Sequence, residues 1–196
     1  MKLRPALTRA CLTAAVALIA PEAFGQAAEG TFPVTVTVQN SVTLTSIQDL
    51  AFGTVTAISS NAAGDTAAMT VPITSSAPTA TAGASALIIP ITGAKRGEYE
   101  VSDAPPFTPL DITLPATVPL AGGAGSASFT VDHLAVGLVT GKGSNLTSPL
   151  ANTYNATTNA TGQLGFYVGG TLNTAVSPLP YIEQTYQGDL KITINY

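Results

Sequence analysis

The segment GDLKITINY, residues 188–196, has the alternation of a β-strand. Apolar and polar side chains alternate along it, so one face carries Leu190, Ile192, Ile194 and Tyr196. Because successive side chains of a strand point to opposite faces, the pattern predicts a strand that is half buried on one side. A second segment with this alternation, TFPVTVTVQ at residues 31–39, presents Phe32, Val34, Val36 and Val38. The question is whether these two strands pair, and whether they do so within one molecule or between two.

Similar short alternating stretches recur along the chain, separated by Gly, Pro, Asn and Ser. Strands are expected at residues 41–47, 49–53, 67–75, 86–93, 97–103, 110–116, 127–137 and 162–173. Many short strands between turn signals predict an all-β fold, an immunoglobulin-like β-sandwich of antiparallel strands. Pro72 and Pro90 cannot donate to a ladder, which places their strands at sheet edges or at bulges.

Other stretches carry more local signals. The uniformly apolar ALIIPITG, residues 86–93, is typical of a central strand. Residues 140–161 have few apolar side chains and predict a long exposed loop, in which Asn145, Asn155 and Asn159 begin N-glycosylation patterns. AGGAGSA, residues 121–127, indicates a tight hairpin turn. The pair Gly169-Gly170 indicates a bulge or a close approach of two backbones.

The N-terminal residues have the features of a secretory signal peptide. Basic residues precede an apolar run over residues 10–20, and Ala23-Phe24-Gly25 follows with small residues at the positions that a signal peptidase reads. The run is too short to span a membrane comfortably. We therefore expect residues 1–25 to be cleaved, with cleavage after Ala27 as the alternative, and the protein to be secreted or to lie at the cell surface.

The mature chain is poor in charge. Once residues 1–25 are removed, four basic and ten acidic residues give a net charge of −6, which does not favour binding to nucleic acid. The only cysteine, Cys11, lies in the signal segment, so the mature protein has no disulfide and no thiol chemistry. About 170 residues are enough for one domain of ordinary size.

The N-terminal strand is predicted to be separable from that domain. Even-numbered apolar residues continue from Phe32 to Leu44, interrupted by Asn40. One continuous strand would greatly exceed the usual 5–6 residues and would point Asn40 into the core. A break at Asn40-Ser41 avoids both, so we expect an N-terminal extension at residues 26–40 and a β-sandwich domain at residues 41–196.

The sequence offers little chemistry for an enzyme. His133 is the only histidine, and we expect it to be a hydrogen-bonded or exposed residue at the end of a strand. There is no GxSxG segment around a nucleophile, and metal sites built on several His or Cys are impossible. The spacing of Asp103, Asp111 and Asp132 matches no calcium loop. The sequence therefore predicts no enzymatic activity, no cofactor, no metal site and no small-molecule substrate.

Several longer motifs resemble one family. LAFG (residues 50–53), GEYEVSDAPPFTPLDITLP (97–115), GFYVGGTLN (165–173) and YQGDLKITINY (186–196) resemble bacterial secreted proteins of the domain of unknown function 4402. The resemblance extends over residues 32–196. In layout that family is similar to spore-coat-U-like and fimbrial subunits, which implies a structural protein of the cell surface. It also implies identical subunits as partners, together with a periplasmic chaperone and an outer-membrane assembly protein.

Two functional hypotheses follow. In the first, the protein is a subunit of an extracellular filament, and the face of Phe32, Val34, Val36 and Val38 completes the sandwich of a neighbouring subunit by donor-strand complementation. The segment with Leu190, Ile192, Ile194 and Tyr196 would then form one wall of the acceptor groove. In the alternative, the strand closes its own sheet in a monomeric secreted β-sandwich that coats the surface or binds carbohydrate.

Overall fold

The structure is a computed structural model that describes residues 33, 35, 41–147 and 152–196. The chain divides into two units, and the one described below spans Gln39–Tyr196. The expected signal peptide and the expected donor residues Phe32, Val34, Val36 and Val38 lie outside the described residues. The described part of the chain contains strands and no helix, and hence no helix long and apolar enough to cross a membrane.

Strand β11 (Leu164–Thr174) is the centre of the larger sheet. Its first half pairs with β6 (Gly97–Ser102) and its second half with β3 (Ala68–Val71), while β9 (Phe129–Leu138) lies along its other edge. Three strands complete this antiparallel sheet: β1 (Thr43–Gln48) beside β6, β4 (Thr79–Thr81) beside β3, and β8 (Val118–Leu120) beside β9. Most side chains of β11 are buried, as its apolar sequence requires.

Two glycines allow β11 to change partner from β6 to β3. A Cβ atom on Gly169 would lie 2.5 Å from the carbonyl oxygen of Val71 and 2.9 Å from the amide nitrogen of Ile73. The register against β9 also shifts between Gly169 and Thr171. The expected bulge and close backbone approach are therefore both present.

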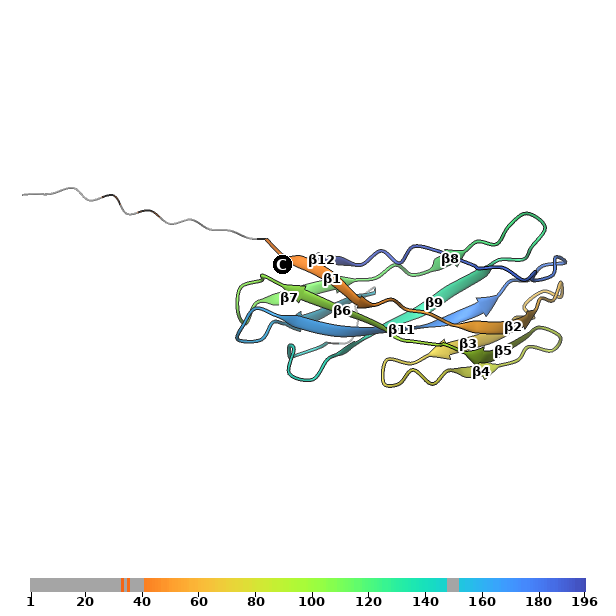
Figure 1. Ribbon diagram of the computed structural model, residues 1–196, viewed down its shortest axis with the longest axis horizontal. Helices are drawn as coiled ribbons and strands as arrows, with labels where there is room; N and C mark the ends of the chain where they lie inside the picture. Colours follow the sequence, from red (N-terminus) through yellow and green to blue (C-terminus); the bar gives the residue numbers. More distant parts are fainter. Residues whose placement is uncertain (1–32, 34, 36–40, 148–151) are drawn as a thin grey trace, which may run out of the picture. The chain divides into compact units, whose positions relative to one another are not determined.

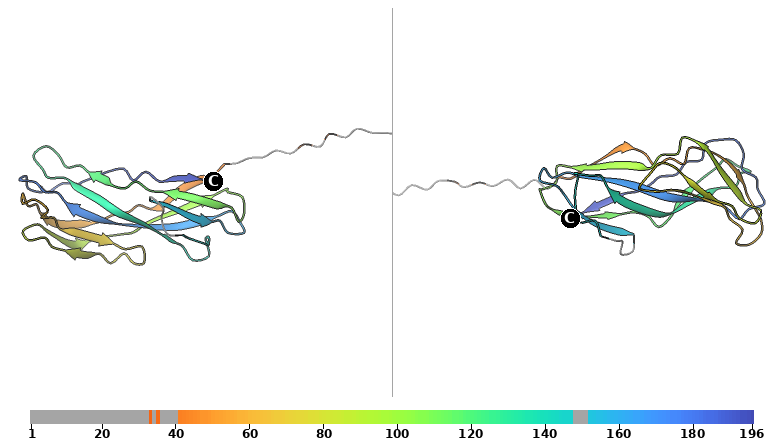
Figure 2. Two further views of the ribbon diagram at one scale, coloured as in Figure 1. Left: turned by 180° about the vertical axis from the view of Figure 1, so that it is seen from behind. Right: turned by 90° about the horizontal axis from the view of Figure 1, so that it is seen from below.

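The smaller sheets complete the architecture. One has the order β10 (Thr153–Thr157), β7 (Pro109–Thr113), β12 (Thr193–Asn195), and the other pairs β2 (Thr54–Ile58) with β5 (Leu87–Thr92). The sheet that contains β7 lies against the larger sheet as a second layer (Figures 1 and 2). The hydroxyl of Tyr154 on β10 crosses between the layers and donates a 3.1 Å hydrogen bond to the carbonyl of Leu134 on β9. The prediction of an all-β, antiparallel sandwich is confirmed.

The core lies between the two layers. It is built from alternate side chains of the strands, among which Phe166, Met69, Ile88, Leu110, Ile112 and Leu164 are the largest that are fully buried. Tyr99 and Phe166 pack with their ring centroids 5.7 Å apart. Since residues on both layers follow a period of two, the hydrophobic pattern fixes which face of each strand is inward.

Several local predictions were wrong. Residues 140–161 are not one long loop, because β10 lies within them and its Tyr154 and Ala156 are buried. The stretch ALIIPITG is not a central strand, since β5 pairs only with β2 among the described strands. Residues 49–53 form no strand and contribute one isolated bridge, from Ala51 to Lys95. Strands β2, β4 and β8 were missed.

The two proline predictions had different outcomes. Pro72 follows directly after the end of β3 and lies in no strand. Pro90 lies inside β5, and the register against β2 shifts between Val55, which pairs with Pro90, and Thr54, which pairs with Thr92. A bulge at this proline is therefore confirmed.

Candidate functional site: an open edge of the sandwich

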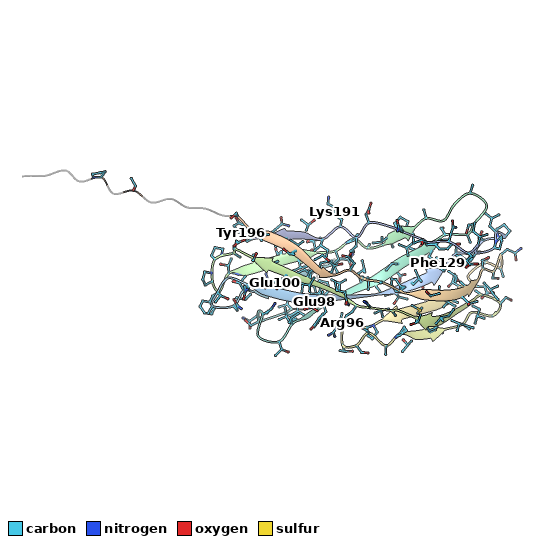
Figure 3. The ribbon with its side chains drawn as sticks, viewed as in Figure 1. Arg96, Glu98, Glu100, Phe129, Lys191 and Tyr196 are labelled. Carbon is cyan, nitrogen blue, oxygen red and sulfur yellow. The ribbon has the colours of Figure 1, made fainter. Side chains whose placement is uncertain are left out.

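The candidate site lies where the larger sheet and the β10-β7-β12 sheet each end. Among the described strands, β1 pairs only with β6, and β12 pairs only with β7. The C terminus lies at the same end of the sandwich as the start of β1, so β1 and the C-terminal segment run in opposite directions along this edge (Figures 1 and 2). Figure 3 shows Lys191 and Tyr196 along it.

Strand β1 lacks cover on its inward face. Five of its six residues, Thr43 to Ile47, are exposed, whereas its neighbour β6 alternates between buried and half-buried residues. Leu44 has the same parity as Val42, which packs against the core, yet Leu44 is 38% exposed. An inward leucine in a complete sandwich would be covered by the opposite sheet. Here the opposite sheet ends too early to cover it.

A groove of about 360 Å³ runs between β1 and the C-terminal segment. Its lining residues are Leu44, Ser46, Tyr99, Leu190, Lys191 and Ile192. Tyr99 is buried in the core beneath the groove, and this burial raises the pKa of its hydroxyl. The lining is thus mainly aliphatic and aromatic, with Ser46 and Lys191 as its polar members. Such a surface suits apolar side chains better than a polar ligand.

Residues 190–192 of the C-terminal segment line this groove, and only residues 193–195 of the segment form a regular strand. Thr193–Asn195 pairs with β7, with Ile194 opposite Ile112. Leu190 and Ile192 precede that strand, and they pack half-buried against the core together with Ile194. Tyr196 is 59% exposed. Of the four expected wall residues, Leu190 and Ile192 line the groove, whereas Ile194 and Tyr196 are not among its lining residues.

An aromatic cluster holds residues 181–186, which precede this wall in the sequence, against β9. Phe129 on β9 stacks on Tyr181 with a centroid distance of 4.1 Å, and Tyr186 packs edge-on against Phe129 at 5.0 Å. The hydroxyl of Tyr181 donates to the carbonyl of Ser128 and accepts from the amide of Ala175. Burial raises the pKa of Tyr181. The cluster was not evident from the sequence, because Phe129 lies far along the chain from Tyr181 and Tyr186.

The next residues, Gln187 and Gly188, contact the end of β8 before the chain reaches the groove. Ala121 and Gln187 form a bridge, and Gly188 lies so close to the carbonyl of Pro119 that no side chain would fit. The wall residues Leu190 and Ile192 are thereby held between this attachment and the pairing of β12 with β7. A groove with a wall fixed at both ends is preorganised for its occupant.

His133 lies on β9, which pairs with β11 and β8 and is not one of the strands that border the open edge. It occupies a bulge inside β9 rather than a strand end, with a φ of 47°. Its Nδ1 lies 2.8 Å from Asp132 Oδ1, which also accepts a hydrogen bond from the Asn173 side chain. Within the described ranges, no group of three or more His, Cys, Asp or Glu side chains is placed to hold a metal ion.

The expected glycosylation loop is also reorganised. Asn155 is a residue of β10, and its side chain donates to Asp111 on β7 at 2.9 Å. The side-chain oxygen of Asn159 accepts hydrogen bonds from the amides of Thr161 and Gln163. The side-chain amides of Asn155 and Asn159 are therefore engaged in hydrogen bonds within the domain.

The fold and the groove define a class: a β-sandwich protein with an open groove between its first and last described strands. Residues 42–196, well over half of the chain, match the family described as Domain of unknown function (DUF4402). The chain belongs to that family, as its motifs indicated. Neither the curated proteins nor the solved structures provide a match.

Proposed function

We propose that the protein is a structural subunit of an extracellular or cell-surface filament, assembled by donor-strand complementation. The N-terminal strand of one subunit, with Phe32, Val34, Val36 and Val38, fills the groove of the next. The observation that supports this most is the uncovered edge, where the inward Leu44 on β1 and the half-buried Leu190 and Ile192 border a groove. A strand laid into this groove would cover all three side chains and pair with a free sheet edge.

The energies indicate that this joint depends on pairing as well as burial. Covering four apolar side chains of the donor stabilises the joint by roughly 6–12 kcal/mol. Ordering about seven backbone residues costs roughly 7–14 kcal/mol. Ladder hydrogen bonds and the coverage of Leu44 and Ile192 then decide the outcome. A subunit with an empty groove exposes an apolar edge, so a periplasmic chaperone is an expected partner, with an outer-membrane assembly protein.

The alternative is a monomer whose own N-terminal strand closes the groove. The observation that favours it is proximity, because β1 begins at the end of the sandwich where the groove wall ends (Figure 1). Side-chain parity restricts this closure. A two-residue turn at Asn40-Ser41 would place Thr37 opposite Leu44 and point the threonine face into the groove. A three-residue turn at residues 39–41 is required to place Val36 opposite Leu44, whereas a strand from another subunit meets no such restriction.

Two measurements test the proposal. Size-exclusion chromatography and negative-stain microscopy of the native protein distinguish polymers from monomers. Intact-mass measurement of protein recovered outside the cytoplasm tests export, with Gln26 as the expected first residue; a mass that retains Met1 to Gly25 would refute it. The proposal includes no enzymatic activity, so His133→Ala should leave assembly unchanged. A secreted hydrolytic activity that disappears with this change would overturn that part.

A further inference from the structure

The chain between the expected donor strand and β1 is short enough to act as a turn. The donor strand reaches Val38, and Val42 already packs against the core of the sandwich. A strand that returns along β1 over so few residues must run antiparallel to it, because a parallel return needs a dozen residues or more. Among the described strands only β6 pairs with β1, so the other edge of β1 is open to such a hairpin.

The register of β1 against β6 identifies which side chains of β1 lie over the core. Leu44 stands opposite the fully buried Val101, and Ser46 stands opposite Tyr99. Directly opposite residues of an antiparallel pair share a face, so Leu44 and Ser46 both point toward the groove. They line it together with Tyr99. A strand that adds to β1 must therefore place apolar side chains opposite these two residues.

One turn brings the apolar face of the donor strand into this position. A three-residue turn at residues 38–40 sets Val34 opposite Leu44 and Phe32 opposite Ser46. The largest donor side chain then stands opposite the smallest of the groove-lining side chains. A turn with an even number of residues would instead bring the threonine face of the strand to the groove, because successive side chains alternate between the faces.

Side-chain size favours this register over the next one with the same parity. Ser46 leaves room beside the ring of Tyr99, which lines the groove with it. A phenylalanine fills such a space and packs its ring against the tyrosine. A turn one residue later, at residues 39–41, would set Val34 opposite Ser46 and move Phe32 beyond the residues of β1 that line the groove.

Asn40 suits the turn at residues 38–40. In a three-residue hairpin turn the third residue takes a left-handed conformation, which asparagine adopts more readily than most residues with a side chain. Asn40 occupies that third position, whereas the later turn would place Ser41 there, and serine rarely adopts this conformation. Asn40 is also the residue that interrupts the apolar alternation from Phe32 to Leu44. A turn at this position explains the interruption.

We propose that the unassembled subunit closes its own groove through this turn, and that opening the turn releases the strand to the groove of the next subunit. The inference rests on the proposed function and adds a regulated state to it. The strand makes the same contacts in its own subunit and in the next one, as in domain swapping. The turn and the protein concentration then set the balance between closed monomer and polymer. Closure also covers the open edge of the sheet before assembly.

Cross-strand disulfides test the register and the closed state together. In a Cys11→Ser background the sequence has no other cysteine, so Phe32→Cys and Ser46→Cys can be combined in the full-length protein. Oxidised while dilute, this variant should form an intramolecular bond, run as a single chain and have no free thiol. Oxidised in the filament, it should give a ladder of covalent multimers. The pair Phe32→Cys and Leu44→Cys is the matched control, because it is two residues out of register and too far apart to bond well.

Substitutions at Asn40 provide an independent readout. Asn40→Val disfavours the left-handed conformation and hence the closed monomer, so we expect the concentration needed for polymerisation to fall about tenfold. Asn40→Gly retains that conformation and should not lower this concentration. Ser41→Val is the matched control, because residue 41 is extended in the closed hairpin and accepts a β-branched side chain there.

The outcomes separate self-closure from the donor-strand joint. If polymers form but the dilute protein gives no intramolecular disulfide, or if Asn40→Val and Ser41→Val polymerise equally, self-closure through this turn is overturned and the proposed function stands. A protein that remains a closed monomer at every concentration would refute the proposed function, and the release of the strand to another subunit with it.

Discussion

Leu44 on β1 and Ile192 in the C-terminal segment line the same groove, although one lies near the start and the other near the end of the domain's sequence. Leu44 belongs to the outermost strand of the larger sheet, and Ile192 leads directly into the outermost strand of the β10-β7-β12 sheet. The two sheets therefore stop at the same side of the sandwich and leave a groove between them in which Leu44 is uncovered. A β-strand is the element that fits such a gap.

Leu44→Asp should abolish assembly while leaving the subunit folded. Leu44 is already 38% exposed, so the free energy of unfolding should change by less than about 1 kcal/mol. Although Lys191 lines the same groove, a carboxylate beneath an inserted strand would lose its hydration, and we expect this to oppose insertion by several kcal/mol. Sedimentation of polymers and thermal unfolding measure the two effects. Thr43→Asp, on the same strand and the opposite face, is the control and should still polymerise.

A charge on the donor strand should have the same effect from the other side. Val36→Asp places a carboxylate at the centre of the inserting face, and we expect assembly to be blocked by a cost of several kcal/mol. Thr35→Asp and Thr37→Asp lie on the opposite face and should cost much less. Electron microscopy of material from all three variants gives the comparison. Equal polymerisation by Val36→Asp and Thr35→Asp would show that this face is not the one buried.

Gly169→Ala should destabilise the subunit by about 1–3 kcal/mol, the usual effect of overpacking in a core. The new methyl group would lie 2.5 Å from the carbonyl of Val71, and backbone there cannot move without disturbing β3. Chemical denaturation measures the change. Gly123→Ala is the control, because its methyl group would meet only the side chain of Gln184. A loss no larger than that of the control would mean that β3 and β11 are not this close.

Asp65 should make stability depend on acid pH. Its carboxylate accepts hydrogen bonds from the amides of Ala84 and Ser85 at 2.7 and 2.9 Å. A hydrogen bond with Ser60, followed by these amides, lowers its pKa below the ordinary value of 3.8. A depressed folded pKa gives stabilisation that is present above the unfolded value and is lost as the pH falls through the folded value.

Asp65→Asn should therefore lower the thermal midpoint near neutral pH and reduce its further fall in acid. Asp103→Asn, in an exposed turn, is the control and should behave like the wild type. Parallel pH profiles for the wild type and Asp65→Asn would contradict the proposed role of this carboxylate.

The sequence predicted those elements whose alternation is strong. The apolar residues of β6 and β11 follow a period of two and are buried as expected. In β9 the period changes at the bulge, so that Phe129 and Val131 are buried before it and Leu134 and Val136 after it. Strand β10, TYNAT, was missed because its inward residues are Tyr154 and Ala156, in a stretch dominated by Asn and Thr. Strand β5 was placed centrally because both of its faces are apolar. That apolar outer face, with Ile89 and Ile91, is exposed.

The sequence pointed to some residues of the groove and not to others. The alternation of the C-terminal segment singled out Leu190 and Ile192, which line the groove, together with Ile194 and Tyr196, which are not among its lining residues. The opposite wall required knowledge of the sheet order, because β1 looks like any half-buried strand until it is found at an edge with Leu44 uncovered.

The most direct test of the central claim removes the donor strand and returns it in trans. A subunit lacking residues 26–39 is combined with a synthetic peptide of that sequence and followed by size-exclusion chromatography and hydrogen exchange. We predict aggregation of the truncated subunit alone. With peptide we predict a stable monomer that cannot polymerise, in which the amides of residues 43–48 and 190–195 become protected. A full-length protein that is monomeric at all concentrations, with residues 32–38 protected from exchange, would instead show that the strand closes its own sheet and would contradict the account.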